Sequence, residues 1–596
     1  MRTKVYDSFG RPGPHIDASI PVRRWDLGLA YAALGFGLAF TPLALATLGV
    51  RDTLRALSLD PSFYSRIDNY TFFPDMAWLA AASCAGLLAG AALGWAGLIP
   101  RSQQWVVAGP RLLEGKQAIQ SARKRSTPVK HRPADRFGLA IHPDLWLSKK
   151  ILSRHILIYG SVGSGKTQIL LALLKQVFTK ADAKLCLYDV KGDMTAKFPS
   201  ATIVSPFDKR SRVWHVARDV RTATQAAAFA DSLIPEDSGS GKFWTQAARQ
   251  ILLGVVRSLQ NEKPEAWTWT DLAQRVSMRA EEMAPILEQN YRKAYGLISN
   301  TEGQTAFNVL ATLNGYTKFI DDLARAWPDY EIYDSKGKRR TFSITDWASD
   351  DYDGPKKFIV QSGPDAGLAS AYISAMINVV VPTIVSPRLP DNEEGRFLGF
   401  FFDELSSIGK INFAPLVDKG RSKGVVVVAG VQDLAQLREI YGDNSVKALA
   451  GMVGTHIICQ IQMSETREEL SKLLGTNKVA RMDYAPGSKL HNEGQPVVYP
   501  NQLTDMLGFR KVPKKHKTDP GFAIRAIVQQ GGDLLLLDFP GQPLPDKRKG
   551  QVAAEWTTKP AGFEPARATK TIESAVAGKQ IGQSFSAEEI DAFFAR

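Results

Sequence analysis

Eight consecutive residues near position 160 combine three glycines with a lysine and a threonine. They are Gly160, Ser161, Val162, Gly163, Ser164, Gly165, Lys166 and Thr167. In a phosphate-binding loop with this spacing, the glycines let the backbone wrap the phosphates, the lysine neutralises the β/γ charge and the threonine ligates Mg²⁺. An apolar run precedes the loop and a helix-forming run follows it. A helix placed there directs its dipole at the phosphates. The pattern therefore predicts a site for ATP and Mg²⁺.

A pair of carboxylates supplies the second half of such a site. The apolar run 397–404 ends in Asp403 and Glu404. We expect Asp403 to hold Mg²⁺ through water and Glu404 to polarise the attacking water. A pair that caps a helix N-terminus is the structural alternative. An Asp-Glu pair favours hydrolysis over transfer to a small acceptor, so the two motifs together indicate an ATPase.

Further polar residues lie at the ends of apolar runs. Gln432 is either a sensor of the γ-phosphate or an ordinary turn residue. Arg421 is a candidate arginine finger that reaches the nucleotide of a neighbouring subunit, with a DNA phosphate contact or a plain surface position as alternatives. The cluster Asp189, Lys191 and Asp193 either lines the nucleotide pocket or forms a turn that caps a helix.

The elements that position these residues follow from the hydrophobic pattern. Continuous apolar runs indicate strands buried on both faces of a sheet. They cover residues 155–160, 184–189, 201–206, 357–363, 397–404, 424–432, 456–461 and 534–539. Helical patterns between them predict a mostly parallel, doubly wound α/β sheet. The stretch 220–330 contains only helical patterns, so we expect an all-α domain inserted into the α/β domain.

Two stretches without charged residues lie near the N-terminus. They predict membrane-spanning helices at about 27–50 and 76–99, because about 20 apolar residues cross the bilayer core. A signal peptide fits the first poorly, since its apolar run is too long and a second span follows; a buried helix of a soluble protein is the other alternative. Basic flanks on both outer sides place both termini in the cytoplasm. Small residues in the second span permit close helix contact, within the hairpin or between subunits.

Composition adds weaker constraints. The chain of 596 residues carries a formal net charge of +14, which favours anionic partners such as nucleic acid or an acidic membrane surface, or is simply a basic solvated surface. The three cysteines have no metal-ligand spacing, and nothing requires disulfides, so most of the chain is expected in the cytosol. The absence of an LSGGQ-like motif speaks against an ABC transporter.

The expected organisation has six parts. They are a cytoplasmic N-terminus (1–25), a transmembrane hairpin (26–100), a basic linker (101–150), a nucleotide-binding domain (151–219 and 331–545), the all-α insertion (220–330) and a mostly disordered tail with a short terminal helix (546–596). The terminal helix is either a docking peptide or a frayed end. The basic segment 510–517 either contacts DNA or acidic lipid, or is a solvated loop.

These motifs occur together in an order that resembles a known family. The stretches HILIYGSVGSGKTQ, YDVKGDM, FWTQAARQILLGVV, FFFDELSSIGKI, DKGRSKGVVVVAGVQDLAQL and GGDLLLLDFPG, after two N-terminal spans, look like a type IV coupling protein of the TraD/TrwB/VirD4 type. The resemblance implies a RecA-like P-loop NTPase domain interrupted by an all-α domain, assembled as a homohexamer around a channel. By position, Lys166 and Thr167 match the Walker A pair, and Asp403 and Glu404 match the Walker B pair. Gln432 and Arg421 match the sensor glutamine and the finger arginine.

The resemblance also implies partners. Members are inner-membrane ATPases that recruit a relaxase bound to single-stranded DNA and pass it to the channel of a conjugative type IV secretion system. An FtsK-like translocase of double-stranded DNA is one alternative, although that family usually has more spans and a winged-helix tail. A receptor or adaptor for protein substrates, whose assembly is gated by the ATPase, is the other. The near-neutral tail departs from the long acidic tail of some members, which puts docking of the relaxase through the tail in doubt.

Overall fold

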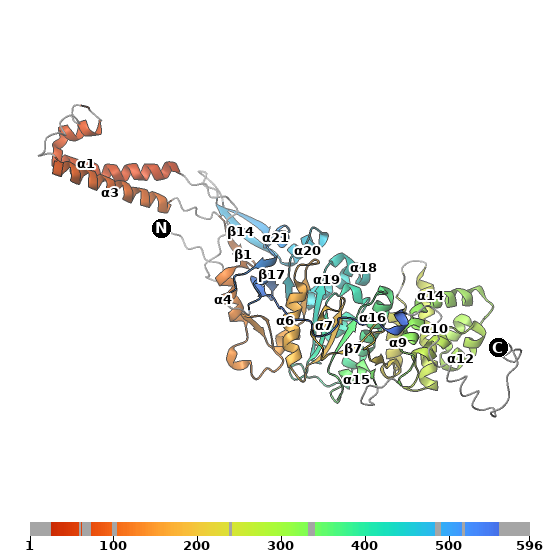
Figure 1. Cartoon of the computed structure of the whole chain (residues 1–596). Coiled ribbons are helices and arrows are strands. Elements are labelled where there is room, and N and C mark those ends of the chain that lie inside the picture. Colours follow the sequence, from red (N-terminus) through yellow and green to blue (C-terminus); the bar gives the residue numbers. More distant parts are fainter. Residues whose placement is uncertain are drawn as a thin grey trace, which may run out of the picture. The chain divides into compact units, whose positions relative to one another are not determined.

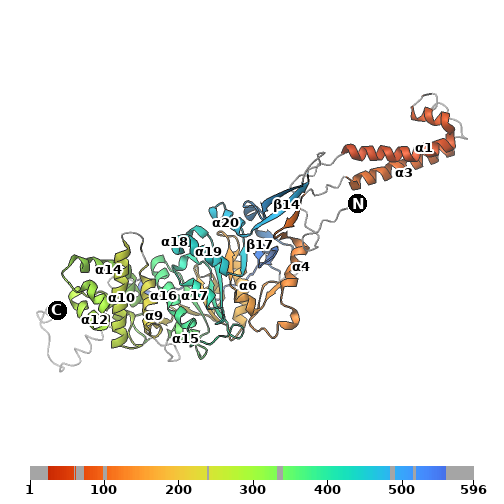
Figure 2. The same ribbon diagram turned by 180° about the vertical axis from the view of Figure 1, so that it is seen from behind.

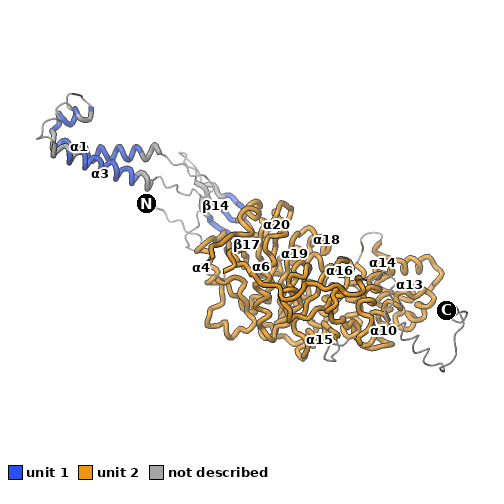
Figure 3. Tube along the Cα trace, in the orientation of Figure 1, with its two compact units in different colours: residues 1–111, 476–496 blue, residues 112–475, 497–596 orange. Residues whose placement is uncertain are grey.

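The computed structural model describes residues 25–58, 61, 73–97, 104–235, 237, 241–331, 340–482, 490–514 and 519–558 (Figure 1). The chain divides into two compact units (Figure 3). Unit 1 comprises Met1–Arg111 and Thr476–Pro496, and unit 2 comprises Leu112–Gly475 and Val497–Arg596.

Unit 1 contains a hairpin of two apolar helices, α1 (Trp25–Leu57) and α3 (Phe73–Gly97). Glycines let the two backbones touch: a Cβ atom added to Gly90 would lie 2.2 Å from the carbonyl oxygen of Tyr31. One added to Gly35 would lie 2.3 Å from the carbonyl oxygen of Gly86. The small residues of the second predicted span therefore serve contact within the hairpin.

One helix of the hairpin is long and apolar enough to cross a membrane. Among the described helices, two are long and apolar enough to cross a bilayer, and Leu29–Ala46 of α1 is one of them. The other is α16 (Ala366–Ile384), which is two-thirds buried inside unit 2 and is a core helix. In α3 the apolar stretch is shorter, Ala80–Leu93. The predicted span 27–50 falls within α1, and the part of the predicted span 76–99 that the structure describes, residues 76–97, falls within α3. Leucines such as Leu38 and Leu88 are about 70% exposed on these helices, as side chains that face lipid would be.

Unit 1 also holds a three-stranded antiparallel sheet that the sequence did not predict. Its strands are β1 (Gln104–Ala108), β14 (Thr476–Met482) and β15 (Leu490–Pro496). The expected basic linker 101–150 is thus partly a strand. The rest of that range forms α4 (Gly115–Arg125) and the hairpin of β3 (Leu139–His142) and β4 (Leu145–Leu147) in unit 2. The sequence did not reveal these elements because the strand and the hairpin are short and gain their burial from tertiary contacts.

The central sheet of unit 2 has a parallel core that carries the site. Its strands, in spatial order, are β13 (Thr455–Ile458), β5 (Ile156–Tyr159), β12 (Val425–Val431), β11 (Leu398–Phe402), β6 (Lys184–Asp189), β10 (Lys357–Gln361) and β7 (Thr202–Val204). Beyond β13 the sheet continues with two antiparallel pairings, to β17 (Phe522–Gln529) and then to β18 (Leu534–Pro540). The short edge strand β2 (Leu112–Leu113) pairs parallel to β18. All eight predicted apolar runs form strands of this sheet.

Both faces of the sheet are covered, as the continuous apolar runs predicted. Ile156 and Ile158 of β5 join a hydrophobic cluster with α6 (Lys166–Thr179) and α4. The residues between and after them, Leu157 and Tyr159, join a second cluster with α16 and the inserted helices. The doubly wound α/β arrangement is confirmed, and it leaves the carboxyl ends of the parallel strands as the edge that can hold a ligand.

The stretch predicted as an all-α insertion forms a group of helices beside the sheet (Figures 1 and 2). The helices are α9 (Ala223–Leu233), α10 (Lys242–Glu262), α11 (Trp269–Val276), α12 (Ala280–Asn290), α13 (Arg292–Ile298) and α14 (Gln304–Ala326). The chain leaves and returns through two paired strands, β8 (Val213–Trp214) and β9 (Thr341–Phe342). The buried carboxylate of Asp219 ties this junction together, because it accepts hydrogen bonds from Trp214 Nε1 at 2.6 Å, Ser343 Oγ at 2.5 Å, Thr345 Oγ1 at 2.7 Å and two backbone N–H groups.

The first part of the predicted tail is ordered against unit 2. The backbone N–H of Lys547 donates to the carbonyl of Ala196 at 2.8 Å, and Trp556 Nε1 donates to the carbonyl of Pro206 at 2.6 Å. Residues 546–558 are therefore a strap across unit 2. They were expected to be mostly disordered because their composition is polar, but their hydrogen-bond partners lie some 350 residues earlier in the chain. Residues 559–596, including the predicted terminal helix, lie outside the described residues.

Candidate nucleotide-binding site

The glycine-rich loop connects β5 to α6 at the carboxyl edge of the sheet. Gly163 and Gly165 have φ angles of 77° and 97°, which only glycine adopts readily. Gly160 is required for a different reason, because a Cβ atom there would lie 2.9 Å from Cβ of Cys459. The loop is also anchored to the end of β13, where the backbone N–H of Ser161 donates to the carbonyl of Gln460 at 3.0 Å. The backbone thus holds the conformation that phosphate binding requires.

Lys166 is the first residue of α6 and is buried in the loop. Its Nζ donates to the carbonyl of Gly160 and, at 3.4 Å, to that of Ser161. Burial lowers the pKa of Lys166. The ammonium group lies at the N-terminus of a 14-residue helix, so a cation and a helix dipole point at the same space.

The two motifs predicted from the sequence meet in this space. Thr167 Oγ1 lies 3.4 Å from Oδ1 of Asp403, which follows β11. Burial, together with the charges of Asp189 and Glu404, raises the pKa of Asp403 to about 6. A bound cation would offset that cost. Within the described residues no group of three or more His, Cys, Asp or Glu forms a metal cluster, but Mg²⁺ beside phosphates needs only one or two protein oxygens, so Thr167 and Asp403 fit it.

Glu404 directly follows Asp403 in the chain and is buried, with 7% of its surface exposed. Its Oε1 accepts hydrogen bonds from Ser406 Oγ at 2.8 Å and from the backbone N–H of Gln432 at 3.4 Å. Its Oε2 is buried without a partner, and burial raises the pKa of Glu404. The short helix that follows, Ser406–Ile408, has Leu405 at its N-cap position and no side-chain cap, so the structure does not support the alternative of a capping pair. A buried carboxylate oxygen with no partner is placed to receive a water.

A cleft of about 390 Å³ joins these residues. It is lined by Ser161, Val162, Gly163, Ser164, Gly165, Lys166, Thr167, Gln168, Lys191, Asp193, Asp403, Gln432, Phe509, Phe522 and Ile524. Both interpretations of the acidic turn hold: Asp189 accepts from the backbone N–H groups of Gly192 and Thr195, while Lys191 and Asp193 line the cleft. Asp189 is thus a positioning residue for the two others.

The sequence did not identify one wall of the cleft. Phe509 comes from the edge strand β16 (Gly508–Lys511), and Phe522 and Ile524 come from β17. In the sequence Phe509 directly precedes the basic segment 510–517. Lys515 and Lys517 of that segment lie outside the described residues. The apolar run of residues 522–528, interrupted only by Arg525, was a usable strand signal. Nothing local shows that this strand lies beside the phosphate loop.

Arg421 does not lie in the cleft. Arg421 belongs to the turn before β12, whereas Gln432 follows the other end of the same strand. The seven residues of β12 span about 23 Å, so the two side chains are separated by about that distance. The side chain of Arg421 is 40% exposed and forms an ion pair with Glu393 at 3.0 Å. Of the predicted site residues, the structure therefore brings together the phosphate loop, Asp403, Glu404 and Gln432, and leaves Arg421 at the opposite edge of the sheet.

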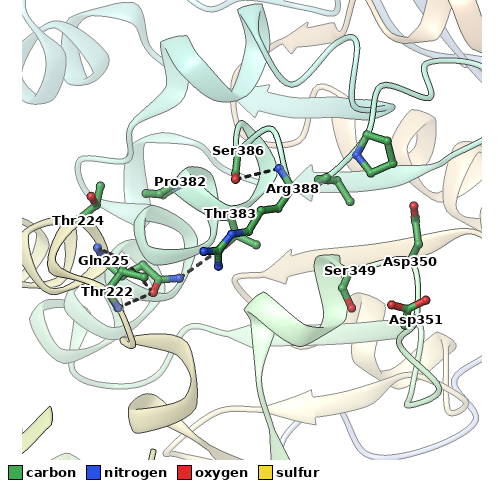
Figure 4. Close-up of a pocket in the computed structure, with 12 residues that line it drawn as sticks. Thr222, Thr224, Gln225, Ser349, Asp350, Asp351, Pro382, Thr383, Ser386 and Arg388 are labelled. Atoms are coloured by element: carbon green, nitrogen blue, oxygen red, sulfur yellow. Dashed lines mark hydrogen bonds between the residues drawn. The ribbon is translucent and has the colours of Figure 1, made fainter. Parts of the chain in front are cut away.

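A second, larger cavity of about 670 Å³ carries none of the predicted motif residues. It lies between α9, α16 and the loop that includes Asp350 (Figure 4). Arg388 extends toward Gln225, and Asp350 and Asp351 lie on the other side. Two of its polar side chains have partners in the protein: Gln225 donates to Thr383 Oγ1 at 3.1 Å, and Asp350 accepts from Arg396 Nε at 2.7 Å.

The fold and the cleft define a RecA-like P-loop NTPase. Residues 140–505 match the family model for the type IV secretion-system coupling protein DNA-binding domain. Because this match covers more than half of the chain, the protein belongs to the type IV coupling proteins. It is 23% identical over 305 residues to the coupling protein TraD of Escherichia coli (strain K12), a match that covers 50% of this chain and only 40% of TraD.

Solved structures agree with this fold. The unbound bacterial conjugative coupling protein TrwBdeltaN70 matches with a TM-score of 0.60 at 20% identity, over 75% of this chain and 96% of that one. TrwB in complex with ADP and Mg²⁺ matches with a TM-score of 0.58 at 20% identity, over 75% and 98% of the two chains. TrwB with the non-hydrolysable GTP analogue GDPNP matches with a TM-score of 0.58 at 21% identity, over 75% and 97%. The expected fold class, a RecA-like domain with an inserted all-α domain and an apolar N-terminal hairpin, is confirmed.

Proposed function

We propose that this coupling protein hydrolyses ATP in the cleft between the phosphate loop and Glu404. The observation that carries the proposal is the unpartnered, buried Oε2 of Glu404. Glu404 directly follows Asp403, which lines the cleft together with Lys166 and Gln432, and its Oε1 accepts from the backbone N–H of Gln432. The site thus offers a cation for the phosphates and a carboxylate for water. TrwB, which has the same fold, has been solved with ADP and Mg²⁺.

In this mechanism each residue has one task. Lys166 and the N-terminus of α6 bind the β- and γ-phosphates, with Thr167 and Asp403 placed to hold Mg²⁺, which would neutralise phosphate charge. Glu404 orients a water toward the γ-phosphate and accepts its proton; the raised pKa makes its carboxylate a stronger base at neutral pH. The backbone N–H of Gln432 and the hydroxyl of Ser406 hold Oε1, so that Oε2 is the oxygen left for the water.

Gln432 also connects the site to the rest of unit 2. The next residue, Asp433, caps α18 (Leu434–Tyr441) and accepts from Thr466 Oγ1 of α20 (Glu465–Leu473) at 2.6 Å. A change at the γ-phosphate that moved Gln432 would therefore reach two helices. This linkage supports its role as a sensor.

The proposed assembly is a homohexamer in which Arg421 completes the site of a neighbouring subunit. Its position at the opposite edge of the sheet supports this role, because Arg421 is about 23 Å from its own cleft by the length of β12. Its partial exposure leaves the guanidinium within reach of another chain. The ion pair with Glu393 would position it.

In the cell, the protein is proposed to be an inner-membrane coupling protein of a conjugative type IV secretion system, with both termini in the cytoplasm. It would recruit a relaxase bound to single-stranded DNA and drive or license transfer to the channel. The DNA-binding family model, the net charge of +14 and the apolar hairpin support this. Membership of the coupling proteins disfavours an FtsK-like translocase. A receptor for protein substrates differs from the proposed motor in one respect: the motor needs ATP hydrolysis for DNA transfer.

The test uses the full-length protein in lipid nanodiscs. We expect ATP hydrolysis that single-stranded DNA stimulates more than double-stranded DNA does. Lys166→Ala should lower the rate by about 100-fold or more, because it removes the cation at the phosphates. Lys175→Ala, an exposed lysine on the same helix, is the matched control and should hydrolyse normally.

The same two variants, tested in donor cells, separate a pump from an adaptor. If Lys166→Ala stops transfer of plasmid DNA, hydrolysis drives or licenses export. Normal hydrolysis and normal transfer by Lys166→Ala would refute the proposed function altogether.

A further inference from the structure

Three apolar side chains form a continuous wall beside the phosphate loop. In the antiparallel pair of β16 and β17, Phe509 stands opposite Ile524, and Lys511 stands opposite Phe522. Residues paired in this way, and those two positions along, point to the same face of a sheet. Phe509, Phe522 and Ile524 therefore share one face, and all three line the nucleotide cleft. We call this set the aromatic wall.

The aromatic wall is held rigidly. The rings of Phe509 and Phe522 stack with their centroids 5.4 Å apart and an interplanar angle of 21°. Phe522 lies over Gly541, where an added Cβ atom would come within 2.2 Å of its ring. Ile524 packs on the last glycine of the loop, since a Cβ atom on Gly165 would lie 2.6 Å from Ile524 Cδ1. The wall thus begins at the loop and ends at Phe509.

Within the described residues, the exposed end of the aromatic wall is not packed into either hydrophobic core cluster. Phe509 is 59% exposed and belongs to neither hydrophobic cluster of unit 2. Its neighbours on β16, Arg510 and Lys511, are exposed charged residues. A rigid aromatic ring that faces solvent on an otherwise polar strand, beside a phosphate-binding loop, has the properties of a stacking surface.

We propose that Phe509 is the stacking platform for the purine base of the nucleotide bound in this cleft. The inference rests on the proposed function, because it concerns the same nucleotide. With its phosphates on the loop, the nucleotide extends along the cleft over Gly165, and the aromatic wall is the apolar surface that begins there. The base then covers the exposed face of Phe509.

The composition of the wall also predicts weak discrimination between purines. Phenylalanine and isoleucine side chains carry no hydrogen-bonding groups, so they read the face of a base and not its edge. Gln168, a polar residue at the same end of the cleft, already accepts a hydrogen bond from the backbone N–H of Gln542 at 2.8 Å. We therefore expect ATP and GTP to bind within a few-fold of each other, and both to bind more tightly than inorganic tripolyphosphate.

The test compares Phe509→Ala with wild-type full-length protein in nanodiscs, and measures the dissociation constants of MgATP, MgGTP and Mg-tripolyphosphate by calorimetry. Loss of the stacked ring should weaken both purine nucleotides by about 5- to 150-fold. Affinity for tripolyphosphate, which has no base, should not change. Phe509→Trp should restore nucleotide binding, and its indole emission should respond to both ATP and GTP. Phe307→Ala, at a 69% exposed position in α14, is the control and should bind like wild type.

Each contrary outcome is distinct. Wild-type affinity of Phe509→Ala for MgATP would overturn the platform and leave the proposed function standing. An equal loss for MgATP and tripolyphosphate would also overturn it, because the substitution would then act on the phosphate loop and not on the base. Absence of MgATP binding by the wild-type protein would overturn both this inference and the proposed function.

Discussion

Acid should destabilise unit 2 through a buried histidine, His155, which precedes β5. Its Nδ1 accepts from the backbone N–H of Val427 at 3.0 Å, and its Nε2 donates to the carbonyl of Val417 at 2.9 Å, so the ring is neutral in this arrangement. Burial lowers the pKa of His155 from 6.5 to about 4. The unfolded chain therefore takes up this proton more readily than the folded one, and stability is lost as the pH falls from about 6.5 to about 4.

The size of this effect follows from the two pKa values. At pH 5 the difference between 6.5 and about 4 removes about 2 kcal/mol of stability relative to pH 7.5. For a cooperative unit of about 400 residues, that corresponds to a fall in melting temperature of about 2 °C. His155→Asn removes the titrating group, and asparagine tolerates the φ of 64° at this position. The variant will be less stable at pH 7.5, but its additional loss on acidification should be smaller than that of wild type by about 2 kcal/mol.

The assay is thermal unfolding of the full-length protein in detergent, followed by tryptophan fluorescence at pH 7.5 and pH 5.0. His131→Asn, at an exposed position, is the matched control and should keep the wild-type dependence on pH. If His155→Asn loses as much stability between the two pH values as wild type does, the buried, neutral histidine is not the acid-sensitive group and the reasoning is refuted.

Three further substitutions test separate parts of the structure. Asp219→Ala leaves five hydrogen-bond donors at the junction of the inserted helices without their acceptor. Measured by thermal unfolding, it should lower the free energy of unfolding by about 3 kcal/mol or more. Asp443→Ala, at an exposed position, should lower it by less than about 1 kcal/mol. Gly165→Ala meets both a positive φ and Ile524, so it should abolish MgATP binding in calorimetry, whereas Gly163→Ala, which meets no atom within 4 Å, should weaken it only several-fold. Arg548→Ala removes a side chain that donates to three backbone carbonyls, so the strap 546–558 should be cut sooner in limited proteolysis; an unchanged cleavage rate would contradict that role.

The parallel half of the fold could be predicted because its information is local. Strands such as β11 and β12 are buried on both faces, so each is a continuous apolar run. The phosphate loop is equally local, since Lys166 and Thr167 follow the glycines directly. The carboxyl ends of parallel strands lie at one edge, so Asp403 and Gln432 were expected near the loop before any contact was known.

The parts that were not predicted depend on contacts between distant segments. Strand β1 pairs with β14 about 370 residues later, and neither has a long apolar pattern. The strap 546–558 is polar and ordered by backbone hydrogen bonds. Phe509 lies beside the loop only because β16 pairs with β17, which continues the sheet past β13. Local sequence patterns carry no information on such pairings.

The most direct measurement of the proposed chemistry is phosphate release by Glu404→Gln in the full-length protein with MgATP and single-stranded DNA. The substitution keeps the shape of the side chain and removes the carboxylate that would take the proton from water. We expect MgATP to bind with wild-type affinity or better, while the rate of phosphate release falls by about 100-fold or more. Phosphate release at the wild-type rate by Glu404→Gln would contradict the assignment of this cleft as the hydrolytic site.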